Sequence, residues 1–186
     1  MLKKGKRELI LDAAIELFAE FGYGCTSVDD ISRKVNVAKG TIYNYFSSKK
    51  DILEAVITRH QSVLGRKIDE LVEKHDNFSD FIFECMKMVF DYFTENTDEL
   101  RVLSSVLYLN NEESREFLKM HYDILLCDSR GLEKYIEKGQ ISSDDIEFLH
   151  IIFSGIVTEL VFAGDYRNKR YSDEEIRKII KYIIGE

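Results

Sequence analysis

Apolar residues recur at intervals of three and four along almost the whole chain, and this spacing limits its fold more than any other feature. Leu9, Ala13, Leu17 and Phe21, for example, repeat every four residues and fall on one side of a helix. The chain has no proline and only 10 glycines among 186 residues, whereas an all-β fold needs turn residues at many points. The sequence therefore predicts an all-α fold.

Capping signals divide this pattern into about nine helices. Gly22 ends the first helix, Ser27 and Asp30 form a capping box at the second, and Gly139 ends the seventh. The expected helices cover about residues 9–21, 28–35, 39–46, 49–71, 78–93, 98–109, 112–138, 143–163 and 173 onward.

Charge is divided unevenly along the chain. Residues 1–50 hold nine Lys and Arg against six Asp and Glu, whereas residues 51–186 hold seventeen against twenty-eight. The formal net charge of −8 therefore conceals a basic N-terminal segment on an acidic body.

Several protein classes lack their sequence signals here. Cys25, Cys85 and Cys127 lie far apart and the four histidines show no ligand spacing, so we expect no disulfide framework, no metal site and a cytoplasmic location. Neither a signal peptide nor an apolar stretch of about 18 residues is present, so we expect no membrane span. Because no glycine-rich phosphate loop occurs either, we expect no cofactor and no enzymatic activity.

Residues 27–51 have the spacing of a helix-turn-helix, in which residues 36–38 separate two short helices. Asn36 is the best candidate in this turn for a positive φ, since its short polar side chain bonds locally. Val37 is expected to point inward and join the two helices.

The second of these helices presents candidate DNA contacts on its outer face, while Ile42 and Phe46 face inward. Gly40 leaves the first turn open for close approach to a phosphate, and lysines flank the helix where phosphates would lie. Tyr45 has the alternative of packing against the first helix. The predicted DNA-binding residues are Ser27, Lys39, Gly40, Thr41, Tyr43, Asn44, Tyr45 and Lys49.

This segment resembles the TetR family of bacterial transcriptional regulators. The resemblance is strong over roughly residues 6–57, and it rests on Phe-Gly-Tyr at 21–23, Thr-Ser-Val-Asp-Asp-Ile at 26–31, Val-Ala-Lys-Gly-Thr-Ile-Tyr-Asn-Tyr-Phe at 37–46 and Ser-Lys-Lys-Asp-Ile-Leu at 48–53. The chain departs from the family where Asn36 replaces a common Gly and Ala38 a common Ser. Since Ala38 cannot cap a helix or donate to a phosphate, we expect no DNA contact there.

The resemblance implies a homodimer whose two recognition helices enter successive major grooves of a palindromic operator. It implies a helix-turn-helix DNA-binding domain at residues 1–48. A helical bundle for ligand binding and dimerisation would follow at residues 49–186. A small molecule bound in this bundle would change the spacing of the two heads.

The predicted helix over residues 143–163 is apolar around most of its circumference, so it must be covered on more than one side. It is either the centre of the bundle or, as we favour, the contact with a second subunit. The predicted interface residues are Ile152, Gly155, Thr158, Phe162, Ile179 and Ile183.

The resemblance also places an effector pocket among the fifth, seventh and eighth predicted helices. The predicted ligand-binding residues are Phe83, Met86, Phe90, Phe93, Tyr122, Leu125, Leu126, Phe153, Val157 and Glu159. For the aromatic residues of the fifth helix the alternative is plain core packing. Glu159 lies within an apolar run, where a buried carboxylate without a partner would be costly. Three interpretations are open: it faces the pocket and selects a cationic or hydrogen-bonding ligand, it pairs with a basic residue, or it is exposed at the edge of the interface.

We therefore expect a repressor that a small apolar or aromatic ligand releases from operator DNA. The alternative is a helical DNA-binding or protein-interaction module that senses no ligand. A void of about 300 Å³ or more in the body favours the sensor, and a solid core favours the alternative.

Overall fold

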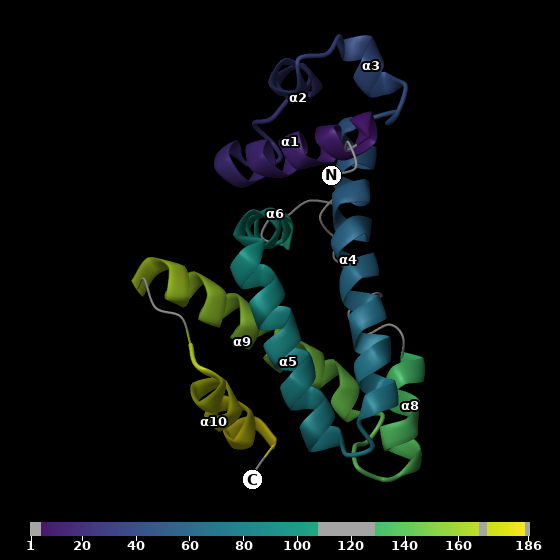
Figure 1. Cartoon of the computed structure of the whole chain (residues 1–186), viewed down its shortest axis with the longest axis vertical. Helices are drawn as coiled ribbons and strands as arrows, with labels where there is room; N and C mark the ends of the chain where they lie inside the picture. The colour runs from purple at the N-terminus through teal and green to yellow at the C-terminus, as the bar shows by residue number, and fades with distance from the viewer. Residues whose placement is uncertain (1–4, 108–128, 168–170, 185–186) are drawn as a thin grey trace. The chain divides into compact units, whose positions relative to one another are not determined.

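The computed structural model describes residues 5–107, 129–167 and 171–184 (Figure 1). Over these ranges the chain forms nine helices and no strand, which confirms the predicted all-α fold. The helices are α1 (Lys6–Phe21), α2 (Val28–Val35), α3 (Lys39–Tyr43), α4 (Lys49–Lys74), α5 (Phe78–Glu95), α6 (Thr97–Leu107), α8 (Ser129–Glu137), α9 (Asp145–Arg167) and α10 (Asp173–Ile184).

Helix starts follow the predicted capping signals. At α2 the Ser27 hydroxyl accepts a hydrogen bond from the Asp30 amide at 3.2 Å, and the Asp30 carboxylate accepts one from the Ser27 amide at 2.8 Å. These bonds satisfy amides that the helix itself leaves without partners. The same reciprocal pair begins α10, between Ser172 and Glu175. At α4 the Asp51 amide donates to the Ser48 hydroxyl, while the Asp51 carboxylate accepts from the Ser47 amide.

Helix ends use the predicted glycines. Gly22 ends α1 with a φ of 82°, and Gly139 follows α8 with a φ of 66°. Residues with a β carbon rarely adopt such angles, so these two positions stop their helices at low conformational cost.

The third helix is shorter than predicted, because α3 ends at Tyr43 rather than at residue 46. The Tyr45 amide donates to the Ile42 carbonyl at 2.9 Å, and the chain turns at residues 44 and 45. This turn places Phe46 in the core, where only 5% of it is exposed. The prediction was wrong over these last three residues, because apolar spacing places Phe46 beside Ile42 whether the chain continues as a helix or turns.

Two further boundaries differ from prediction. The helix predicted over residues 143–163 begins at Asp145 and continues to Arg167, after a turn in which the Ser142 amide donates to the Asp145 carboxylate at 3.0 Å. Of the helix predicted over 112–138 the structure describes only α8, since residues 108–128 lie outside the described residues.

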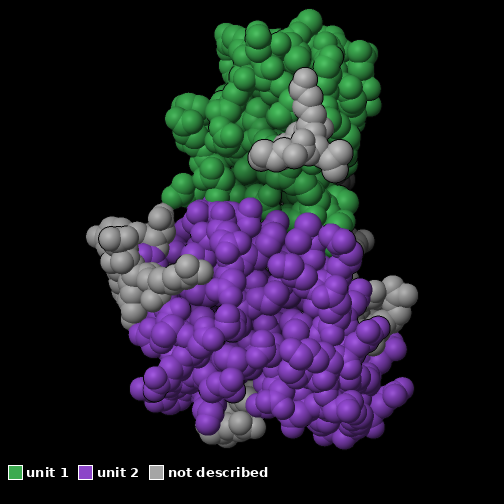
Figure 2. Space-filling model, viewed as in Figure 1, with its two compact units in different colours: residues 1–62, 98–121 green, residues 63–97, 122–186 purple. Residues whose placement is uncertain are grey.

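Packing divides the chain into two compact units (Figure 2). Unit 1 comprises residues 1–62 and 98–121, and unit 2 comprises residues 63–97 and 122–186. Helix α4 therefore contributes to both units, and α6 belongs with the three N-terminal helices. The functional boundary predicted between residues 48 and 49 stays a prediction.

The core of unit 1 holds α1, α2 and α3 together. Ile10, Ala14 and Phe18 of α1, Ile31 of α2 and Ile42 of α3 are at most 1% exposed. Each such large side chain contributes roughly 2 kcal/mol when it is removed from water. The helix-turn-helix is therefore fixed to α1 by apolar packing.

In unit 2, α5 packs on α9 and α10, and an aromatic cluster joins α5 to α8. The ring of Tyr135 lies 5.5 Å from that of Phe78 and 5.1 Å from that of Phe81. Its hydroxyl donates to the carbonyl of His75 at 2.8 Å. This cluster fixes the end of the hairpin between α4 and α5.

Candidate DNA-binding surface and effector pocket

The turn of the helix-turn-helix has the predicted geometry. Asn36 adopts φ 56° and ψ 51°, the left-handed region that was expected of it. Its amide donates to the Arg33 carbonyl at 3.1 Å, and the Val37 amide donates to the Ser32 carbonyl at 3.0 Å. This pair of bonds is a Schellman motif, which ends α2 and turns the chain towards α3.

Helix α3 has one buried and one exposed face. Ile42 is fully buried against the core of unit 1, while Tyr43 is 48% and Tyr45 is 43% exposed. Asn44 and Gly40 are also exposed, and Thr41 is half-buried. Packing thus leaves the predicted contact residues on the outside, and the exposure of Tyr45 does not favour the alternative that it packs against α1.

Neither crowding by described residues nor a positive φ requires a glycine at position 40. A β carbon built there would meet nothing within 4 Å, and its φ is not positive. The space beside Gly40 is therefore open to an external molecule.

Three predicted DNA contacts already have partners inside the chain. The hydroxyl of Ser27 caps α2, and its hydrogen bonds to Asp30 hold the pKa of that carboxyl at about 2. The ammonium of Lys39 donates to the Asp29 carboxylate at 2.8 Å, which raises the lysine pKa. The ammonium of Lys49 donates to two carbonyls of the turn between α1 and α2.

An ion-pair cluster in unit 1 was missed by sequence reasoning. The Arg59 guanidinium in α4 lies 2.8 Å from the Asp12 carboxylate in α1 and 2.9 Å from the Glu99 carboxylate in α6. These partners are 47 and 40 residues away in the sequence, so no local spacing could have indicated them. The cluster ties α6 to α1 and α4.

Unit 2 contains an apolar hollow of about 80 Å³. Among the predicted ligand-binding residues that the structure describes, only Phe153 lines it. The other lining residues, which the prediction missed, are Ile68, Phe78, Phe81, Ile82, Cys85, Val89, Leu132, Ile146 and Leu149. Apolar spacing indicates which residues are buried, but not which buried face borders a void.

Five other predicted ligand residues, four on α5 and one on α9, are core residues that line neither described hollow. Phe83, Met86, Phe90, Phe93 and Val157 are at most 5% exposed. The guanidinium of Arg177 lies 3.7 Å from the ring centroid of Phe83 and covers it. For the aromatic residues of α5, core packing was the alternative interpretation of the sequence. Tyr122, Leu125 and Leu126 lie outside the described residues.

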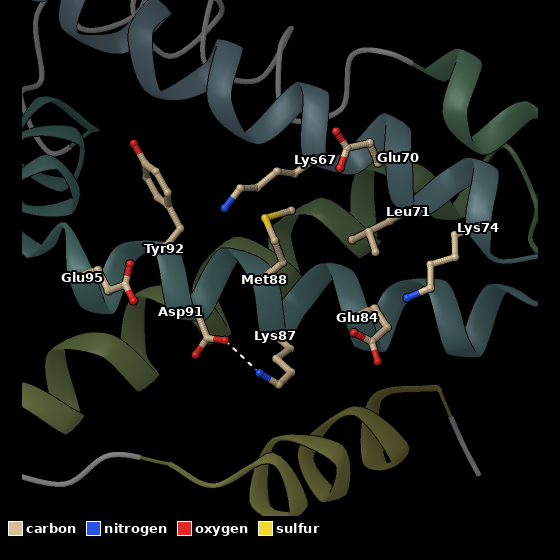
Figure 3. Close-up of a pocket in the computed structure, with 10 residues that line it drawn as sticks. All are labelled: Lys67, Glu70, Leu71, Lys74, Glu84, Lys87, Met88, Asp91, Tyr92 and Glu95. Atoms are coloured by element: carbon tan, nitrogen blue, oxygen red, sulfur yellow. Dashed lines mark hydrogen bonds and ion pairs between the residues drawn. The ribbon is translucent and has the colours of Figure 1, made fainter. Parts of the chain in front are cut away.

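A larger groove of about 510 Å³ lies between α4 and α5 (Figure 3). Its lining is mostly charged, with Leu71, Met88 and Tyr92 as its apolar part. Lys87 is paired with Asp91 at 2.9 Å, as the dashed line in Figure 3 marks. This groove is not the apolar wall that the sequence predicted.

Helix α9 is buried on one side only. Val157, Leu160 and Val161 are at most 6% exposed, whereas Phe148 is 66% and Ile151 is 50% exposed. The helix is therefore not wholly internal, and in the described part of the chain it has an exposed apolar face.

The predicted interface residues divide between exposed and half-buried positions. Ile152 and Gly155 are exposed on α9, and Thr158, Phe162 and Ile179 are half-buried. The side chain of Ile183 lies outside the described residues. Glu159 is exposed and lines neither hollow, which favours the interpretation that it lies at the edge of an interface.

The sequence predicted no membrane span and no metal site, and both features can be looked for in the described residues. No helix there is both long and apolar enough to cross a bilayer. The described side chains also form no group of three or more His, Cys, Asp or Glu that could hold a metal ion.

Comparison with known proteins identifies the family of this chain. A sequence profile of bacterial regulatory proteins of the tetR family matches residues 10–56. Over 149 residues the chain is 31% identical to IcaR of Staphylococcus epidermidis, an HTH-type negative transcriptional regulator of the biofilm operon icaADBC; the match covers 78% of this chain and 77% of IcaR. The chain belongs to the TetR family.

Two other TetR-like proteins are similar over most of their length. The fatty acid metabolism regulator protein of Bacillus subtilis is 26% identical over 174 residues, covering 91% of this chain and 88% of that protein. A structure of FadR from Bacillus subtilis in complex with stearoyl-CoA shares the fold, with a TM-score of 0.73 at 23% identity, covering 97% of this chain and 96% of that one.

Membership in the TetR family identifies the general activity. Its members are transcriptional regulators rather than enzymes, in agreement with the sequence prediction. Regulators of this family bind operator DNA, dimerise and bind small-molecule effectors.

Proposed function

We propose that this chain is a repressor that binds a palindromic operator as a homodimer and leaves it when an apolar effector binds in unit 2. The observation that carries the proposal is the exposure of Tyr43 at the end of α3 and of Asn44 and Tyr45 in the turn that follows it, beside the buried Ile42. Polar and aromatic side chains held on a packed helix suit contacts to base edges and phosphates in a major groove. The proposed contacts are Lys39, Gly40, Thr41, Tyr43, Asn44 and Tyr45.

Thr41 and Asn44 are the residues that we propose for base readout. A duplex selected by the wild-type protein from a random-sequence library supplies the probe. Asn44→Ala should alter the preference between the selected duplex and its base-substituted versions by roughly 1–3 kcal/mol. An equal loss on selected and random duplexes would exclude a base contact at Asn44.

Gly40 allows a test that separates DNA approach from folding. In both Gly40→Ala and Gly65→Ala the new β carbon meets nothing within 4 Å, and both glycines lie in helices. Each variant should be as stable as wild type or more stable by up to about 1 kcal/mol. Only Gly40→Ala should weaken DNA binding, because only that β carbon faces the proposed phosphate. Equal DNA affinity of both variants would contradict close approach at Gly40.

The dimer proposal rests on the apolar face of α9. Phe148, Ile151 and Ile152 are exposed on one side of this helix, and large exposed apolar residues at helical spacing indicate a protein contact. Ile152→Glu should yield folded monomers in sedimentation, because the side chain is already 40% exposed in the single chain. Glu159→Gln, on the same helix, should remain a dimer, and a monomeric wild type at micromolar concentration would contradict the proposal.

For the effector we propose a molecule with a long apolar chain. The apolar lining in unit 2 suits such a ligand, and fatty acid regulation appears in the name of a relative at 26% identity. Stearoyl-CoA, with coenzyme A alone as the control, is the first probe because FadR shares this fold and holds it. Stearoyl-CoA should release the wild-type protein from its selected duplex, whereas coenzyme A should not. Phe153→Ala should change that response, and Glu159→Gln should preserve it.

The size of the apolar hollow favours the second candidate function, a DNA-binding module without an effector. Its volume of about 80 Å³ is below the roughly 300 Å³ that a ligand pocket needs, so a ligand would have to displace side chains. Release by no apolar probe, together with unchanged DNA binding, would support the module over the sensor.

A further inference from the structure

The side chain of Lys49, in the first turn of α4, is fully engaged inside unit 1. Its ammonium donates to the carbonyl of Tyr23 at 2.7 Å and to the carbonyl of Thr26 at 2.9 Å. It also lies 4.3 Å from the ring centroid of Tyr23, within the range of a cation–π interaction. Two of the three N–H groups of the ammonium are therefore directed at carbonyls of the turn, and the Tyr23 ring lies beside them.

The partners of Lys49 are themselves well fixed. Tyr23 is 7% exposed, and its ring packs edge-on against Phe18 at 5.3 Å. Thr26 is 3% exposed, and its hydroxyl lies within hydrogen-bond distance of the Gly22 and Leu17 carbonyls, at 2.9 Å and 3.2 Å. Lys49 thus connects α4 to a rigid part of the turn between α1 and α2.

This connection lies directly before the helix-turn-helix, because the residue after Thr26 is Ser27, the N-cap of α2. We infer that Lys49 is a positioning residue that holds this turn on the first turn of α4, and so fixes α2 and α3 relative to α4, rather than a phosphate contact. A phosphate would have to compete with two carbonyls and an aromatic ring for this ammonium. The inference rests on the proposed binding of DNA by α3.

Lys50 provides a matched control. It carries the same charge on the next residue of α4, and its ammonium lies 3.9 Å from the Glu54 carboxylate, one helical turn away on the same helix. Lys50→Met therefore removes the same charge as Lys49→Met without breaking a link to the turn.

The test compares Lys49→Met, Lys49→Arg and Lys50→Met on the duplex selected by wild type and on random duplex, over a range of KCl concentrations. A positioning role predicts that Lys49→Met loses about tenfold in affinity for the selected duplex. Affinity for random duplex and the salt slope should stay as in wild type, since no phosphate contact is lost. Lys49→Arg should restore binding only in part, because a planar guanidinium presents its N–H groups in a fixed fork at other positions than the compact ammonium.

Two DNA-binding results would overturn the inference. A phosphate contact predicts a salt slope lowered by about 0.9 in Lys49→Met, equal losses on both duplexes, and near-normal binding by Lys49→Arg. Unchanged binding in Lys49→Met at a temperature well below its unfolding would leave Lys49 with a role in stability alone.

A measurement without DNA separates this inference from the proposed function. Hydrogen exchange at the amides of residues 23–26 should be faster in Lys49→Met and unchanged in Lys50→Met. Equal exchange in both variants would refute the connection, whereas failure of wild type to select any duplex would refute the proposed function instead.

Discussion

Replacement of Arg59 by Met should destabilise unit 1 much more than loss of an ordinary surface ion pair. The guanidinium is 2.8 Å from Asp12, 2.9 Å from Glu99 and 3.6 Å from Glu8. The Arg59 side chain is 27% exposed and that of Glu99 only 8%. Methionine keeps the length of the buried stem but removes the cation that brings α1, α4 and α6 together.

The size of the effect follows from this partial burial. Exposed ion pairs contribute about 0–1 kcal/mol, whereas removal of one partner from a fully buried pair costs about 3–5 kcal/mol. The Arg59 cluster lies between these limits, so Arg59→Met should lower the free energy of unfolding by about 2 kcal/mol. For a chain of this length that corresponds to a fall of roughly 6 °C in Tm.

Thermal and urea unfolding, followed by circular dichroism at one fixed protomer concentration, measure this loss. Arg101→Met is the matched control, because Arg101 forms an exposed pair with Asp98 at 3.2 Å on α6. It should change stability by less than about 0.5 kcal/mol. Adding Glu99→Gln to Arg59→Met should recover part of the loss, since it removes a carboxylate that no longer faces the arginine. Equal stability of Arg59→Met and Arg101→Met would refute the reasoning.

Three further changes test other parts of the structure. Because burial lowers the pKa of His60 from 6.5 to about 4, the unfolded chain binds a proton between these pH values that the folded chain does not. Stability should therefore fall by up to about 3 kcal/mol from pH 6.5 to pH 4, and His60→Leu should remove this part of the pH dependence in urea unfolding. Iodoacetamide should alkylate the exposed Cys25 in the native protein. Cys85, whose pKa burial raises to about 12, should react only after denaturation, and rapid native labelling in peptide mapping would contradict its burial. Asn36→Ala should cost about 1 kcal/mol in thermal unfolding whereas Asn36→Gly should be nearly neutral, and equal losses would exclude the left-handed turn as the cause.

Features set by neighbouring residues could be predicted from the sequence. The capping box of Ser27 and Asp30 and the left-handed turn at Asn36 depend on groups within a few positions. Helix-turn-helix geometry and most helix boundaries followed from such local rules. The end of α3 did not, because Phe46 is buried whether the helix continues or the chain turns, so apolar spacing does not mark where the helix ends.

Features that depend on distant partners could not be predicted. Lys49 was expected to contact phosphate because it is a lysine beside the recognition helix, but its carbonyl partners lie 26 and 23 residues earlier. No residue close to Arg59 in the sequence indicates that it pairs with Asp12 and Glu99. Phe83 and Phe90 were predicted to line a ligand pocket, with core packing as the alternative; both are buried, but the apolar hollow lies along another face of α5. Periodicity identifies a buried face, while the packing of several helices decides where space remains.

The central claim is that two copies of this chain bind one palindromic operator through α3. Hydroxyl-radical footprinting of the duplex selected by wild type, combined with sedimentation of the same complex, tests it most directly. The account predicts one homodimer per duplex and two protected stretches about one helical turn, roughly 34 Å, apart on the same side of the DNA. A single protected stretch bound by a monomer would contradict it.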